Sequence, residues 1–308
     1  MKELRGKIFN YIFNVREWGI FVKRLFSLVV IAILSFLIWL FPISLIVAPF
    51  YSMTTTKSNV VKIHKDISGK TTIMSLEYGL EDLLDEGLVT NFTGVNLWID
   101  NKYFEQVGQL EMYRIAVYTL ENNLARNRGT GGANKYLVQA RSEIYADYEL
   151  PIFTSYSTRL KQAIKNIQKY TKQLEEDNTK QMNDKRAVFI VNSDNLAEVI
   201  DKLKQQLQTN IMIKSNFFSD DDKFYRIKGN LIAMQKFLQG IEYDFKNKMI
   251  DKSSYKENFV PLLQIIQSAI AQNHIVILES FGHVSKLEKD ANIIAQKLGE
   301  LRDKLRNG

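Results

Sequence analysis

The sequence predicts an all-α protein: one N-terminal transmembrane helix followed by an elongated periplasmic helical bundle. Three observations support this fold class. Residues 25–49 contain no ionisable side chain, and most later segments repeat apolar residues at helical spacing. Beyond that apolar segment the only prolines are Pro151 and Pro261. Scarce proline favours long helices, because proline removes a helical hydrogen bond and clashes with the preceding turn.

Residues 25–50 are predicted to form the transmembrane helix. About 20 apolar residues are enough to cross a hydrocarbon core of about 30 Å, whereas a buried helix of a soluble domain rarely stays apolar on every face for so long. Pro42 lies inside this segment and is expected to kink it. A cleaved signal peptide is disfavoured, because no small-x-small cleavage site follows the apolar run.

The flanking charges predict the orientation of this helix. Residues 1–24 carry six lysines and arginines against two glutamates, a net charge of 6 − 2 = +4. Basic residues beside a first span favour the cytoplasmic side. We therefore expect a cytoplasmic N-terminus in the bacterial inner membrane, with the chain from residue 51 onward in the periplasm. Residues 8–21 also have an apolar side, which fits either a separate interfacial helix or an early start of the span.

Composition limits the chemistry of the exported part. The chain has no cysteine, which excludes disulfides and thiolate metal sites. Its net charge of +7 leaves 7 − 4 = +3 for all residues after the first 24. Without a dense basic block, nucleic acid is not expected as a partner.

Two periplasmic regions are predicted, residues 51–180 and residues 190–308. The first carries helical apolar stripes at 71–87, 103–126 and 155–176, and the second begins with a helix behind the N-cap cluster Ser193-Asp194-Asn195. Residues 89–100 and 186–191 have weak strand character, but an isolated pair of short strands is only marginally stable.

The C-terminal third is predicted to be an antiparallel three-helix bundle. Its helices are expected within 227–245, 254–281 and 284–305. In the first and last of these, apolar residues alternate steps of four and three, the period of coiled-coil-like packing. Short connections make neighbouring helices antiparallel.

No catalytic constellation, cofactor motif or metal site is evident, so an enzyme is not predicted. His274 and His283 are nine residues apart, a spacing that suits neither a helical ligand pair nor a finger loop. Three acids at 220–222 are best explained as complementing a helix dipole. The glycine-rich loop at 128–132 lacks the Gly-Lys-Ser/Thr ending of a phosphate-binding loop.

Two blocks of the sequence resemble a known family. Residues 97–130 (LWIDNKYFEQVGQLEMYRIAVYTLENNLARNRGT) and 217–245 (FFSDDDKFYRIKGNLIAMQKFLQGIEYDF) are similar to the proteobacterial domain-of-unknown-function family 2333. The resemblance implies a single-pass inner-membrane protein with a helical exported domain. It supplies no catalytic residue.

Six residues in or beside these blocks are candidate interaction residues. The arginines either bind an anionic ligand or lipid headgroups or form surface ion pairs, and the aromatic residues form either a docking patch or core filling. Gly108, early in a helix, is expected to allow close helix approach. The six candidates are Trp98, Arg114, Arg126, Arg128, Phe217 and Phe218.

The sequence favours a membrane-anchored scaffold or interaction protein, a component of a cell-envelope complex. The alternative is a periplasmic domain that senses a ligand or modifies peptidoglycan or lipid. Expected partners are inner-membrane lipids and envelope proteins, and a homo-oligomer stays open. The cytoplasmic piece is too short to fold as a signalling domain, which weighs against a one-component sensor.

Overall fold

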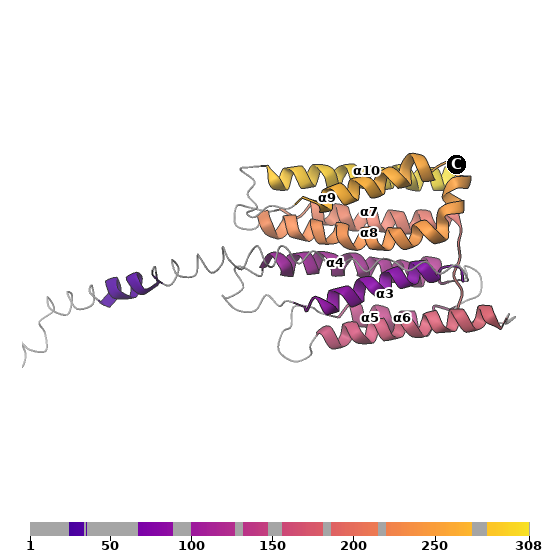
Figure 1. The fold of residues 1–308 in the computed structure, drawn as a ribbon, viewed down its shortest axis with the longest axis horizontal. Coiled ribbons are helices and arrows are strands. Elements are labelled where there is room, and N and C mark those ends of the chain that lie inside the picture. Colours follow the sequence, from indigo (N-terminus) through magenta and orange to yellow (C-terminus); the bar gives the residue numbers. More distant parts are fainter. Residues whose placement is uncertain are drawn as a thin grey trace, which may run out of the picture. The chain divides into compact units, whose positions relative to one another are not determined.

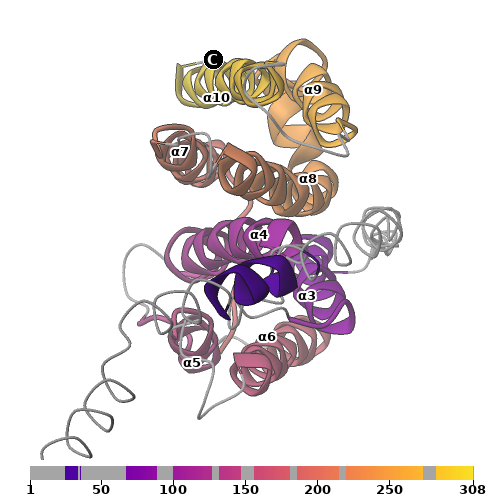
Figure 2. The ribbon, with the colours of Figure 1, turned by 90° about the vertical axis from the view of Figure 1, so that its left-hand side faces the viewer.

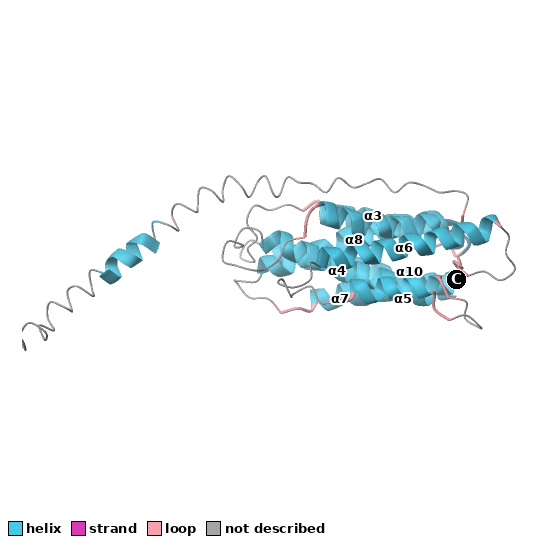
Figure 3. Cartoon of the chain, turned by 90° about the horizontal axis from the view of Figure 1, so that it is seen from below, coloured by secondary structure: helices cyan, strands magenta, loops and turns pink. Residues whose placement is uncertain are grey.

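A computed structural model describes most of the chain as helix (Figure 3). The residues it describes are 25–33, 35, 67–88, 100–126, 132–146, 156–180, 186–214, 220–272 and 282–307. The chain divides into two compact units, Met1–Thr54 and Thr55–Gly308.

In the first unit, residues 25–33 and residue 35 are helical. Their large apolar side chains are exposed, with Phe26 at 68% and Leu28 at 64%. A search of the described residues finds no helix with the length and apolarity needed to span a membrane. The predicted segments 1–24 and 36–50, with Pro42, lie outside the described residues, so the transmembrane helix stays a prediction.

The regular secondary structure in the described part of the second unit is helical, which confirms the all-α part of the predicted fold class. It contains no strand among these residues. The elements in order are α3 (Lys70–Asp85), α4 (Asp100–Thr119), the π-helix η2 (Leu120–Leu124), α5 (Lys135–Ile144), α6 (Tyr156–Thr179), α7 (Ser193–Ile211), α8 (Asp220–Asp251), the π-helix η3 (Tyr255–Phe259), α9 (Val260–Ile270) and α10 (His283–Asn307).

These helices lie side by side and stack in pairs. Figure 1 shows them along one common direction, and Figure 2 shows α9 with α10, α7 with α8, α3 with α4, and α5 with α6. The most extensive contacts join neighbouring pairs, α8 on α4 and α10 on α7, while α5 and α6 pack closely within their own pair. α4 and α8 therefore form the centre of the bundle.

Most predicted helices are present, and three details differ. The helix α5 was not predicted, although Asn134 caps it by accepting a hydrogen bond from Tyr136 N at 3.0 Å. The N-cap of α7 is Asn192, one residue before the predicted cluster. Residues 186–192 form neither helix nor strand: Ile190 N donates to the Leu124 carbonyl at 2.8 Å, and these residues, the strap, lead into α7.

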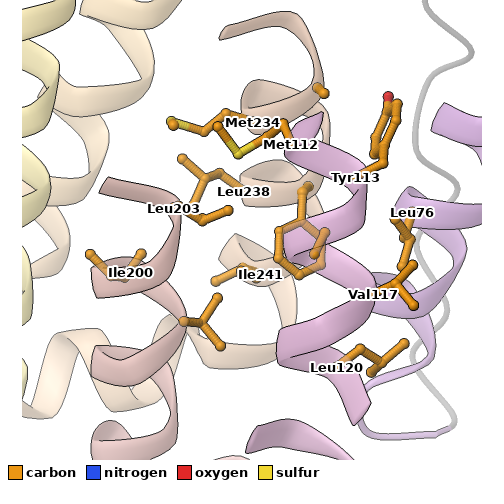
Figure 4. Close-up of a cluster of buried hydrophobic side chains, with 14 of the residues drawn as sticks. Leu76, Met112, Tyr113, Val117, Leu120, Ile200, Leu203, Met234, Leu238 and Ile241 are labelled. Atoms are coloured by element: carbon orange, nitrogen blue, oxygen red, sulfur yellow. The ribbon is translucent and has the colours of Figure 1, made fainter. Parts of the chain in front are cut away.

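The predicted C-terminal bundle is part of a larger one. α8, α9 and α10 contact one another, and successive helices run in opposite directions (Figure 1). α8 also packs on α3 and α4, and α10 packs on α7, so one apolar core extends across both predicted periplasmic regions. In Figure 4 side chains of α4, α7 and α8, including Met112, Leu203 and Leu238, meet in this core.

At the centre of the bundle, two glycines allow α4 and α8 to approach closely. A methyl group on Gly108 would overlap the Arg226 carbonyl oxygen, and one on Gly229 would overlap the Glu105 carbonyl oxygen. At the same crossing Asn230, fully buried, donates to the Gly108 carbonyl at 2.9 Å. The predicted close approach at Gly108 is confirmed.

α3 is attached to α8 by polar groups at both of its ends. The Asp244 carboxylate accepts hydrogen bonds from Gly69 N at 3.0 Å and from Thr72 N at 2.8 Å, so a side chain of α8 caps the start of α3. Near the other end, Asp82 of α3 and Lys236 of α8 form an ion pair whose side chains are each 8% exposed. Burial lowers the pKa of Lys236 to about 8, and the adjacent carboxylate favours its charged form.

We expect Leu298→Asp to unfold much of the C-terminal half. Leu298 is fully buried in α10, and a carboxylate there would lose its hydration without gaining a partner, at a cost of about 3–5 kcal/mol. Urea unfolding followed by far-UV circular dichroism measures this loss. As a control, Gln296→Asp on the exposed side of α10 should change stability by less than about 1 kcal/mol; equal effects would contradict the packing.

Candidate functional site

The C-terminal end of α4 carries one of the two π-helices of the described core, the other being η3. There the α-helix continues as the π-helix η2, whose Ala125 N donates to the Leu120 carbonyl at 2.7 Å. The strap residue Ile190 bonds to the last carbonyl of η2. π-Turns are frequent at functional sites. This junction is therefore a candidate functional site.

Glu121, in this π-turn, is the buried carboxylate of the junction. Its side chain is 3% exposed, and its Oε2 lies 3.1 Å from Nε of Arg141 on α5. Burial raises the pKa of Glu121, while the nearby Arg141 and Arg126 act in the opposite direction. A carboxyl group of this kind keeps its proton more readily than an exposed one, which is a property of general acids.

Arg114 lies about two turns before Glu121 along α4, and its side chain reaches the end of α5. Its Nε donates to the Ile144 carbonyl at 2.8 Å and its Nη2 to the Ala146 carbonyl at 2.9 Å. Its guanidinium also lies over the ring of Tyr145, 5.7 Å from the centroid. The last carbonyls of a helix have no partner within the helix, so Arg114 caps α5.

A second polar junction joins α4, α7 and α8. Glu111 of α4 forms an ion pair with Arg226 of α8 and accepts a hydrogen bond from Nδ2 of Asn210 on α7 at 2.7 Å. Here too the polar groups of the described core connect one helix to another.

The structure places two of the six predicted site residues. Arg114 caps α5, and Arg126 is exposed two residues after η2, where its charge opposes the rise that burial causes in the pKa of Glu121. The other four candidates, Trp98, Arg128, Phe217 and Phe218, lie outside the described residues. Glu121 and Arg141 were not predicted; an acid between the apolar stripe residues Val117 and Leu124 was the signal in the sequence.

No group of three or more potential metal ligands occurs among the residues that the structure describes. The arrangement at η2 is thus one buried acid, its arginine partner and an exposed arginine beside it.

A family described as "Uncharacterized protein conserved in bacteria (DUF2333)" matches residues 15–209. The chain belongs to this family. No curated protein matches the chain, and no solved structure does.

Membership of DUF2333 confirms the predicted resemblance. The match covers α3 to most of α7, including η2 and its arginines, and it begins before the apolar segment. The similarity predicted for residues 217–245 lies beyond the matched residues. The DUF2333 description names no activity.

If Arg114 is a cap, Arg114→Met should destabilise the fold. The variant loses two charge-assisted hydrogen bonds to helix-end carbonyls, worth about 2 kcal/mol together. Thermal unfolding measures the loss, and amide exchange should rise in α5. Arg159→Met removes only an exposed ion pair with Glu143 at 3.2 Å and should cost less than about 1 kcal/mol. Unchanged stability of the Arg114 variant would contradict the capping role and favour a role of Arg114 in binding a ligand.

Proposed function

We propose that the chain is a membrane-anchored scaffold or interaction protein of the bacterial cell envelope. Its N-terminus lies in the cytoplasm, residues 25–50 cross the inner membrane, and the helical bundle lies in the periplasm. Its partners are inner-membrane lipids and other envelope proteins.

The observation that carries this proposal is how the polar side chains of the described core are used. Arg114 caps α5, Glu111 joins three helices, and Asp244 caps α3 from another helix. The hydrogen bonds of each of these groups join one helix to another. A bundle stiffened in this way is suited to presenting a surface to a partner.

Membrane attachment is supported by the apolar segment. Residues 25–49 lack any ionisable side chain, and the part that is described is a helix with exposed leucine, isoleucine and phenylalanine side chains. Exposed apolar surface on this scale needs a cover, which lipid provides. The charge of +4 before the segment supports a cytoplasmic N-terminus.

One observation favours the alternative, a periplasmic domain that senses a ligand or modifies an envelope substrate. Burial raises the pKa of Glu121 inside a π-turn, and perturbed carboxyl groups cluster at functional sites. Arg126, exposed beside it, is suited to meeting an anionic ligand.

Topology and partners are tested together. A reporter active only in the periplasm, fused after Gly308, should be active, and the same fusion with a cytoplasm-only reporter should be silent. Affinity purification from crosslinked membranes should recover an envelope protein in stoichiometric amount. A silent periplasmic reporter would contradict the orientation, and a lone chain carrying a bound small molecule would favour the alternative.

Two sets of substitutions separate the hypotheses further. Replacing His64, His274 and His283 by Asn should leave the phenotype unchanged if the protein is a scaffold; loss of function with the fold intact would favour a chemical site. Reversing the charge of Arg126 and Arg128 should weaken association by turning attraction into repulsion. Arg114 is left out of this set, because its loss would disturb α5.

A further inference from the structure

One outer face of the bundle carries a row of lysines. Between Tyr156 and Leu174 the chain has five basic residues and no acidic one. Four of them, Lys161, Lys165, Lys169 and Lys172, are exposed on α6. At 100° per residue they lie within about a quarter turn of the helix, over a length of about 17 Å. We call these four residues the lysine row.

The fold directs the lysine row away from the core. α6 packs on α5 and α3 through its apolar residues, among them Leu160, Ile164 and Leu174. Figure 2 shows α6 at the edge of the bundle, at the end opposite α10. The lysine row therefore lies on the side of α6 turned away from its apolar contacts, and within the row Lys169 reaches the Tyr136 ring of α5.

Positive charge on this face is concentrated further by α5. Nζ of Lys135 on α5 lies 5.0 Å from the ring centroid of Tyr136, and Nζ of Lys169 lies 5.4 Å from the same centroid. Two cations on one ring bring like charges close together, and the ring offsets only part of their repulsion. The arrangement thus favours a negatively charged surface opposite it.

On the helix at the other edge of the bundle, the basic residues of the C-terminal half form ion pairs, whereas Lys286 and Lys289 near its start form none among the described residues. On α10, Lys297 pairs with Glu300, Arg302 with Asp201, and Arg306 with Glu198. Among the described residues, no ion pair forms at Lys161 or Lys165. The basic face of α6 is therefore a local feature and does not reflect the charge of the whole bundle.

We propose that the lysine row lies on the anionic headgroup surface of the membrane that anchors the chain. This inference rests on the proposed membrane attachment. A straight row of exposed ammonium groups matches a broad, flat negative surface, and lysine binds such a surface as a point charge without the bidentate geometry of arginine. Docking of α6 would hold the bundle close to the bilayer and fix which face is presented to a partner protein.

The test uses the full-length chain, whose lack of cysteine permits a single label. A fluorophore is placed on Gln162→Cys, an exposed site on α6, or on Asn292→Cys, an exposed site on α10. The chain is reconstituted in vesicles of phosphatidylcholine alone or of equal parts phosphatidylcholine and phosphatidylglycerol, with a quencher attached to the headgroups. Quenching should appear only at residue 162, only with phosphatidylglycerol, and should fade at high salt.

Charge variants identify the groups responsible. Each lysine near an anionic surface contributes about a fivefold bias toward the docked state. Lys161→Glu with Lys165→Glu should therefore lower the docked-to-undocked ratio by about 25-fold or more. The matched control on α10, Lys286→Glu with Lys289→Glu, should leave quenching unchanged. Far-UV circular dichroism verifies that both variants are folded.

The outcomes separate this inference from the proposed function. Protein that stays in the vesicles after salt washing but shows equal quenching at residue 162 in both lipids overturns lysine-row docking and leaves the anchor standing.

Protein that washes off the vesicles overturns the anchor. The free chain is then tested for sedimentation with the same anionic vesicles at low salt. Binding that is lost in Lys161→Glu with Lys165→Glu supports docking, and absent binding overturns it. A crosslink from residue 162 to an acidic protein in native membranes, without lipid-dependent quenching, also overturns it.

Discussion

Replacing Gly229 by alanine should destabilise the bundle by about 3 kcal/mol, although alanine is the better helix former by about 1 kcal/mol. The added methyl group would overlap the Glu105 carbonyl oxygen of α4. Backbone atoms cannot turn aside as a side chain can, so the two helices would have to separate. Separation would also weaken the bond from Asn230 to the Gly108 carbonyl, leaving the buried amide nitrogen with only its 3.2 Å bond to the Arg226 carbonyl.

Urea unfolding of the full-length chain in detergent, followed by circular dichroism, measures this effect. Gly132→Ala is the matched control, because a methyl group there would meet no atom within 4 Å. That variant should change stability by less than about 1 kcal/mol. If Gly229→Ala proved as stable as the control, the close crossing of α4 and α8 would be contradicted.

Periodicity predicted most of the described helices because their apolar stripes are long. Residues 155–176 and 284–305 each predicted a helix that the structure places at nearly the same bounds, in α6 and α10. Helix α5 has only ten residues, of which Leu137, Ala140 and Ile144 are buried. Three small or medium apolar residues give a weak stripe, and the helix is held by α6 and by the cap from Arg114, 30 residues before Ile144.

The contacts that organise the bundle lie between residues far apart in the chain. Gly108 was expected to allow close approach, but the sequence does not indicate that Gly229 is its counterpart. Asp244 caps a helix that begins more than 170 residues earlier. An aspartate within α8 has the same local pattern whether it faces solvent or another helix end, so only the fold reveals its role.

The candidate site was predicted less well than the helices. Arginine at 114 indicated anion binding or a surface ion pair, and its actual partners are backbone carbonyls, which leave no mark in the sequence. Glu121 was overlooked because helical periodicity alone places it at the border of the apolar stripe. The π-turn shifts the phase of the helix at that point, and together with packing against Arg141 this buries the carboxylate.

The second large effect is expected at the buried ion pair between α3 and α8. Lys236→Met should cost about 3–5 kcal/mol, because it leaves the Asp82 carboxylate buried without its cation. The double variant Asp82→Leu with Lys236→Met should recover most of this loss, since a matched apolar pair carries no desolvation penalty. Lys297→Met, which removes a half-exposed pair with Glu300, should cost no more than about 1 kcal/mol. Urea unfolding of the unchanged chain, Asp82→Leu, Lys236→Met and the double variant yields a coupling free energy between positions 82 and 236. A coupling near zero would mean that α3 is held on α8 by its apolar contacts and by the Asp244 cap, and that the ion pair contributes nothing to its attachment.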